Sequence, residues 1–263
     1  MTIPQIARQL GAAVGLLALA VAASGASAAE KLVDTYGEQR TVLSFKVPDA
    51  TAQKLLPEGW QASAATAGPS KDANLNVVFV DVLSVQNPDG TQGETYRYAV
   101  LTVPAKKKGT DATVPMVVTG LSTPPNVPGA YGNYALAIAT VDRHVHTDPA
   151  GKSNIEESWE FRGDSGAAIQ LQLQFVRGVA ARSKAELMPH SGIKPDFYQI
   201  YRIEQAADVV RSTVTGVDRA QKCAFKAAGA KLSLLFDGSE RLISITSLPF
   251  YTRQVFLPED VTQ

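Results

Sequence analysis

The chain has 263 residues and carries 25 lysine and arginine residues against 25 aspartate and glutamate residues, so its formal net charge is zero. Because the basic residues are scattered, neither a nucleic acid nor an anionic membrane surface is an expected partner. Hydrophobic residues make up 45% of the chain, which suffices for a sizeable core. Cys223 is the single cysteine, so an internal disulfide is impossible, and its apolar neighbours predict a buried thiol.

The first 28 residues have the pattern of a cleaved signal peptide. Arg8 supplies a positive charge, an apolar run follows over Gly11–Ala23, and residues 26–28 read A-S-A, a cleavage site of the A-x-A type. The run is short and alanine-rich for a membrane span, and an uncleaved anchor is the alternative. We therefore expect a periplasmic or secreted protein with no membrane contact after cleavage, in which residues 29–263 form a single domain.

Alternation of apolar and polar residues with a period of two dominates the rest of the chain and predicts β-strands. The clearest case is Ile169–Phe175, where three glutamines separate the apolar side chains. Groups rich in Gly, Pro, Asn and Asp separate the segments and predict turns. In chain order the predicted strands are Val77–Leu83, Tyr96–Val103, Tyr134–Val145, Ile169–Phe175, Phe197–Ile203, Leu232–Phe236 and Leu242–Thr246.

Few segments have helix-forming patterns. Asp49 is placed to cap a short helix over Ala50–Leu56, which Pro57 ends, and Ala180–Leu187 contains good helix formers before Pro189. Neither segment is long enough to cover a parallel sheet. We therefore expect a mainly β (α+β) fold, in which a curled antiparallel sheet forms a cone or barrel with two or three short peripheral helices.

The most Pro- and Gly-rich segment after the leader is Ser122–Gly132, STPPNVPGAYG. Loops of this composition and length are either rigid lids over a cavity or irregular crossovers between strands. Both interpretations stay open at the level of sequence.

Two segments resemble the acetoacetate decarboxylase-like superfamily. Thr41–Trp60, TVLSFKVPDATAQKLLPEGW, has the strand, short acidic turn, short helix and L-L-P-E stop of family members. Lys231–Pro258, KLSLLFDGSERLISITSLPFYTRQVFLP, has an L-P step and then an apolar run ending in L-P, similar to the family's last strands. The resemblance covers most of residues 36–260 in outline. It implies a small-molecule ligand, an organic acid or an apolar carbonyl compound, with no cofactor, and self-association into a homo-oligomer.

The family's decarboxylases form a Schiff base on a lysine within a P-K-K step. The resemblance places the equivalent region at Asn126–Tyr134, which has no lysine, and none lies between Lys108 and Lys152. The Pro104–Lys108 sequence, PAKKK, comes too early in the chain and predicts a hairpin tip instead. The chain is therefore identified as a diverged member of the superfamily that lacks the Schiff-base lysine, which leaves any decarboxylase-like lyase activity without its nucleophile.

The resemblance also implies where a ligand binds. The family's arginine aligns with Glu38, and Arg40, two residues on, reaches the same side of a strand. Tyr98 falls at the family's acidic position. Together with Tyr131 and Asn133, from the region without lysine, Arg40 and Tyr98 are the predicted ligand-binding residues. Arg40 would pair with a carboxylate, and the tyrosines would donate hydrogen bonds or a proton.

Other functions stay open. A closed sheet of this kind also carries apolar ligands in other proteins, and an interaction module without a cavity is a further class. His144 and His146 share one face of a predicted strand, so a metal-dependent hydrolase with His190 or a carboxylate as third ligand is an alternative. The simpler interpretation of this pair is a solvated strand end before a turn.

Overall fold

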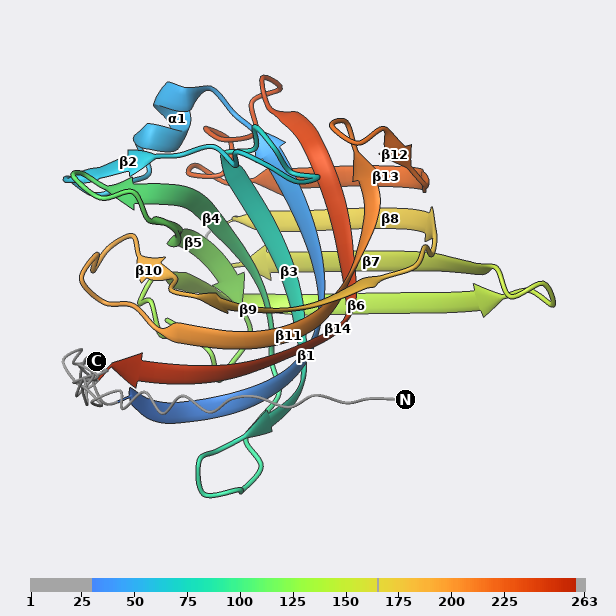
Figure 1. Ribbon diagram of the computed structural model, residues 1–263, viewed down its shortest axis with the longest axis horizontal. Helices are drawn as coiled ribbons and strands as arrows, with labels where there is room; N and C mark the ends of the chain where they lie inside the picture. The colour runs from blue at the N-terminus through green and yellow to red at the C-terminus, as the bar shows by residue number, and fades with distance from the viewer. Residues whose placement is uncertain (1–29, 165, 259–263) are drawn as a thin grey trace, which may run out of the picture.

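The computed structural model describes residues 30–164 and 166–258, so the predicted signal peptide lies outside the described residues. Fourteen strands form one curled sheet that is not closed into a barrel (Figure 1). The mainly β fold class and the curled sheet are confirmed, whereas closure into a barrel is not observed in the described residues. The elements are β1 (Glu30–Lys46), α1 (Asp49–Gln53), β2 (Trp60–Ala62), β3 (Leu75–Gln86), β4 (Arg97–Lys107), β5 (Thr113–Ser122), β6 (Tyr134–Thr147), β7 (Ser153–Gly163), β8 (Ala168–Val176), β9 (Ala181–Leu187), β10 (His190–Ser191), β11 (Ile200–Ser212), β12 (Val217–Asp218), β13 (Ala220–Ala228) and β14 (Arg241–Pro258).

Neighbouring strands follow the order β12-β11-β14-β1-β3-β4-β5-β6-β7-β8-β13, and β2, β9 and β10 pair with β4, β11 and β5, respectively. Most pairs are antiparallel, as expected. The exceptions among the described strands are β5 with β6 and β5 with β10, which run parallel. The loop Ser122–Gly132 is the crossover that makes the β5–β6 pair parallel, and three of its residues also line a cavity described below.

One face of β1, β3 and β4 packs against β7, β8 and β13 to form the main core. The ring of Phe79 on β3 lies 5.6 Å from Trp159 and 6.3 Å from Phe161 on β7, measured between centroids. These three side chains are almost completely buried, and Cys223 on β13 packs against the core while half-buried. Burial of such large side chains stabilises a fold by about 1.5–3 kcal/mol each. This core therefore joins the two halves of the curled sheet.

The opposite face of β1, β3 and β4 is concave, and β14, β11 and the β9–β10 segment curve around it (Figure 1). Because β9 pairs with β11 and β10 pairs with β5, the chain over 181–191 bridges the two sides of the curl. Side chains alternate along a strand, so the neighbours of core residues line this hollow. Val78, next to Phe79 on β3, is an example.

The helix predictions are only partly right. In residues 30–164 and 166–258 the one helix is α1, which has five residues and lies where the first helix was expected. Asp49 does not cap it, because Pro48 holds the cap position and Asp49 accepts hydrogen bonds from Lys46 and Asn74. The second predicted helix, Ala180–Leu187, is wrong, since Ala181–Leu187 form β9. No helix of the described chain is long and apolar enough to cross a membrane.

The strand predicted at Leu232–Phe236 is also wrong. Leu232 and Leu235 are buried, whereas Leu234 is 71% exposed, which is the spacing of a helical turn and not of a strand. The amide of Phe236 accordingly donates a hydrogen bond to the carbonyl oxygen of Leu232 at 3.0 Å. The segment caps the main core after β13 instead of extending the sheet.

Candidate functional site

Three charged side chains are buried together on the concave face of the sheet. Glu38 and Arg40 lie two residues apart on β1 and so project to the same side, and Arg253 lies on the neighbouring β14. Arg40 Nε donates to Glu38 Oε2 at 2.7 Å, and Arg253 Nη2 donates to Glu38 Oε1 at 2.6 Å. The side-chain exposures of Glu38, Arg253 and Arg40 are 0%, 5% and 12%. We call these three residues the ion cluster.

The ion cluster has two guanidinium groups for one carboxylate, so it carries a surplus positive charge. Burial alone would raise the pKa of Glu38, but Arg253 and Arg40 lower it below its ordinary value and keep the carboxylate ionised. Burial opposes the charge of both arginines as well, and Glu38 nevertheless raises their pKa values. A buried charge without a counter-charge is costly. The cluster is therefore suited to receive an anion.

Aromatic rings cover the faces of both guanidinium groups. The Cζ atom of Arg40 lies 3.7 Å from the ring centroid of Tyr251. The Cζ atom of Arg253 lies 4.4 Å from the centroid of Tyr36 and 4.5 Å from that of Tyr201. Such cation–π contacts contribute about 0.5–2 kcal/mol each, with the higher values at desolvated sites. They fix the planes of the guanidinium groups and leave the nitrogen edges for polar partners.

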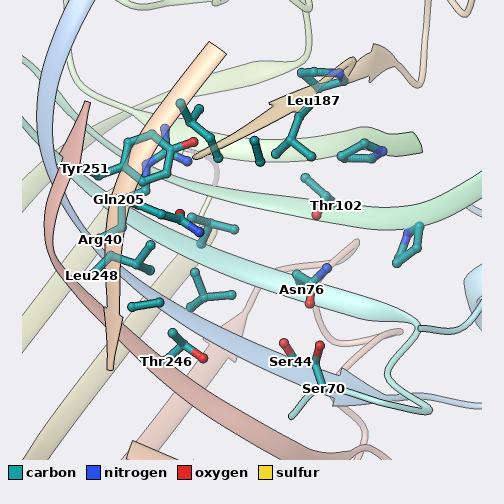
Figure 2. Close-up of a pocket in the computed structure, with 18 of the residues that line it drawn as sticks. Arg40, Ser44, Ser70, Asn76, Thr102, Leu187, Gln205, Thr246, Leu248 and Tyr251 are labelled. Atoms are coloured by element: carbon teal, nitrogen blue, oxygen red, sulfur yellow. The ribbon is translucent and has the colours of Figure 1, made fainter. Parts of the chain in front are cut away.

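A cavity of ≈ 620 Å³ lies next to Arg40 inside the hollow. Figure 2 shows Arg40 and Tyr251 together at one end of it, with Ser44 and Ser70 toward the other. The volume falls in the usual range of small-molecule sites, about 300–1,000 Å³. We call this space the large cavity. The apolar part of its wall includes Val42, Val78, Leu187, Ile203 and Leu248.

A smaller pocket of ≈ 130 Å³ is lined by Arg253 and by tyrosines that include Tyr98 and Tyr131. The Tyr131 hydroxyl donates to the Tyr201 hydroxyl at 2.5 Å, and that of Tyr201 donates to Gln199 Oε1 at 3.2 Å. Burial raises the pKa of both Tyr98 and Tyr131, so these hydroxyls stay protonated at neutral pH. We call this space the tyrosine pocket. Tyr201 lines both the tyrosine pocket and the large cavity.

The structure places two of the four residues that the sequence predicted to bind a ligand in one pocket, and the other two in separate cavities. Arg40 lines the large cavity, whereas Tyr98 and Tyr131 line the tyrosine pocket. Asn133 lies apart from them, in the wall of another cavity of ≈ 480 Å³, and its Nδ2 donates to the Val117 carbonyl oxygen at 2.7 Å. Ligand binding by each of the four residues stays a prediction.

Sequence reasoning missed Arg253. The pattern that points to Arg253 is its place in an inward-facing row of β14, two residues after Tyr251 and two before Val255, both of which are buried. A charged residue in such a row is expected to have a buried partner or a function.

The histidines do not come together. His144 and His146 are exposed on β6, whereas His190 stacks on Tyr198 with 4.9 Å between ring centroids and lies 5.0 Å from Trp60. Within residues 30–164 and 166–258, no group of three or more His, Cys, Asp or Glu side chains is arranged to hold a metal ion. The hydrolase alternative therefore has no third ligand in this part of the chain.

No protein-family model and no curated protein sequence matches this chain. Among solved structures, the enduracididine biosynthesis enzyme MppR complexed with pyruvate is similar, with a TM-score of 0.56 and 10% sequence identity over 86% of this chain and 88% of that chain. An acetoacetate decarboxylase-like enzyme from Sphingomonas wittichii RW1 has a TM-score of 0.53 and 10% identity, over 86% and 91%. At this identity the similarity is one of fold. This chain therefore shares its fold with these two solved proteins, one of which is named as an acetoacetate decarboxylase-like enzyme.

Proposed function

We propose that this chain is a small-molecule-binding protein or diverged enzyme that takes an organic acid into the hollow of its curled sheet. The observation that carries the proposal is the surplus guanidinium of the ion cluster, because Glu38 neutralises only one of Arg40 and Arg253. A ligand carboxylate would supply the missing negative charge, in hydrogen bonds that are stronger than those between neutral groups.

The volume of the large cavity suggests an acid with an apolar body. MppR, similar in fold, has been solved with pyruvate, so a small acid is compatible with this architecture. Pyruvate would fill only a small part of ≈ 620 Å³, and much of the wall is aliphatic. Burial of apolar ligand surface contributes about 25 cal/mol per Å². A longer acid, or one that carries an apolar carbonyl group, would therefore bind more tightly than pyruvate.

We further propose that any reaction here proceeds without a lysine Schiff base. None of the described residues in the walls of the large cavity and the tyrosine pocket is a lysine, and an amine nucleophile is what Schiff-base chemistry requires. The tyrosine hydroxyls, which burial keeps protonated, can donate a hydrogen bond to a carbonyl oxygen. Binding is thus the function that this site supports best.

Export and assembly complete the proposal. Residues 1–28 have the charge, apolar run and cleavage site of a signal peptide, so we place the mature protein in the periplasm or outside the cell. Self-association into a homo-oligomer remains a prediction from the resemblance.

Hexanoate should raise the melting temperature of the mature protein more than hexanamide does, because only the acid compensates the surplus charge. A ligand at about 100 times its Kd stabilises a protein by about 2.7 kcal/mol. Thermal unfolding of wild type, Arg40→Gln and the exposed-site control Arg162→Gln checks this. The advantage of the acid should disappear in Arg40→Gln and persist in the control.

Equal stabilisation by hexanoate and hexanamide would instead support the alternative of an apolar-ligand carrier. If neither compound, nor any acid of a longer series, changes the melting temperature, the chain does not bind organic acids in this hollow.

A further inference from the structure

We infer that the ligand carboxylate lies in the tyrosine pocket, against Arg253, and not in the large cavity beside Arg40. This inference rests on the proposed function and assigns its recognition group. The two arginines flank the same Glu38 carboxylate but line different cavities. The arginine that binds the ligand carboxylate therefore determines which of the two cavities holds the charged end of the ligand.

The donors of the two arginines are used to different extents. Arg40 donates a hydrogen bond from Nε to Glu38 Oε2, and its Nη2, although it lacks a hydrogen-bond partner, lies in ion-pair contact with the same oxygen. Arg253 gives Glu38 only Nη2, and its Nε atom is buried with neither a hydrogen-bond partner nor an ion-pair contact among the described residues. A buried donor left unpaired carries the full cost of its desolvation. An acceptor brought by the ligand would remove that cost at Arg253.

The size and wall of the tyrosine pocket fit a carboxylate. Its volume is ≈ 130 Å³, and one water occupies about 30 Å³ in the liquid, so the pocket has room for roughly four groups of that size. Acetate or pyruvate would fit within it. The body of a longer acid would have to continue past Tyr201, which also lines the large cavity.

Asp34 is the one carboxylate among the described residues of this wall. Tyr36 donates a hydrogen bond to its Oδ2 at 2.8 Å, and no ion pair joins it to Arg253 in the described chain. Burial raises the pKa of Asp34, although Tyr36 and Arg253 oppose that effect. Its negative charge would repel a carboxylate in the tyrosine pocket and would have little effect on one in the large cavity.

Two exposed alanines allow each space to be narrowed separately. Ala130, on the loop between β5 and β6, lines the tyrosine pocket, and Ala185, on β9, lines the large cavity. A leucine at either position adds bulk at a rim without entering the main core. The matched variants are therefore Ala130→Leu and Ala185→Leu, with circular dichroism as a check that both fold.

Calorimetric titration of the mature protein with acetate and with pyruvate tests the inference. Ala130→Leu should lower the affinity for acetate and for pyruvate by about tenfold or more, because the larger side chain would keep the ligand carboxylate away from Arg253. Loss of a hydrogen bond to a charged group costs about that much in affinity. Ala185→Leu should leave both nearly unchanged. Asp34→Asn should tighten both a few-fold, and this variant decides the question independently if the loop substitution disturbs folding.

The reverse pattern, with Ala185→Leu weakening acetate and pyruvate while Ala130→Leu and Asp34→Asn have no effect, would place the carboxylate beside Arg40. That result overturns the inference and leaves the proposed function intact. Failure of wild type to bind acetate, pyruvate and hexanoate alike would contradict the proposed function itself.

Discussion

Replacement of Glu38 by glutamine should lower the free energy of unfolding by about 3–5 kcal/mol, because it leaves two buried guanidinium groups without a carboxylate. Arg40 and Arg253 are both largely buried, so water cannot replace the lost partner. Urea denaturation at neutral pH measures the change. Glu186→Gln is the matched control, since Glu186 pairs with Arg202 at 3.0 Å on an exposed face, where ion pairs contribute little.

The lowered pKa of Glu38 adds a pH dependence to this result. In the folded state the two arginines outweigh burial and hold the pKa below the value of about 4.3 expected for the unfolded chain. The ion cluster therefore stabilises the fold fully above the unfolded pKa and loses its effect as pH falls through the folded pKa. The unfolding free energies of wild type and Glu38→Gln should approach each other below about pH 4. A constant gap across this range would mean that Glu38 is not ionised in the folded protein.

The strands could be predicted from the sequence wherever one face of the strand is apolar and the other polar. Ile169–Phe175 is such a case, and it forms β8 with its apolar residues in the core. Ala180–Leu187 failed because all seven residues of β9 are exposed, so no alternation marks the strand, and it is held in place by pairing with β11. The strand prediction at Leu232–Phe236 failed because the segment is a short, largely apolar run. Such a run does not show whether its buried side chains recur every two residues, as in a strand, or every three, as in a helical turn.

Only part of the candidate site could be predicted from the sequence. Tyr98 and Tyr131 were reached through the resemblance, and they do share a pocket. Arg253 was missed because its role depends on a contact across 215 positions of sequence with Glu38. Asn133 was chosen for its place in the chain near Tyr131, but the start of β6 carries it to another cavity. Two residues that are close in sequence, such as Tyr131 and Asn133, can line different cavities where a strand begins. Two residues that are far apart in sequence, such as Glu38 and Arg253, can come into contact because their strands are paired.

Arg253→Gln should remove carboxylate binding while costing less stability than Glu38→Gln. The reason is a count of buried charges: the ion cluster has one surplus positive charge in wild type, two in Glu38→Gln and none in Arg253→Gln, where Arg40 and Glu38 neutralise each other. Acetate affinity should fall by about tenfold or more, because the unpartnered Nε donor is lost together with the surplus charge. Arg211→Gln, which breaks an ion pair with Asp218 elsewhere on the sheet, is the control and should bind acetate as wild type does.

The same count predicts chemical rescue. Glu38→Ala leaves space between two buried guanidinium groups, so acetate should raise its melting temperature more than chloride does at equal ionic strength, and more than acetate does in wild type. In the double variant Glu38→Ala with Arg253→Gln, one guanidinium remains and the gain from acetate should shrink. If acetate and chloride act alike on Glu38→Ala, the buried arginines do not recruit carboxylates, and the surplus charge cannot be the basis of ligand recognition in this protein.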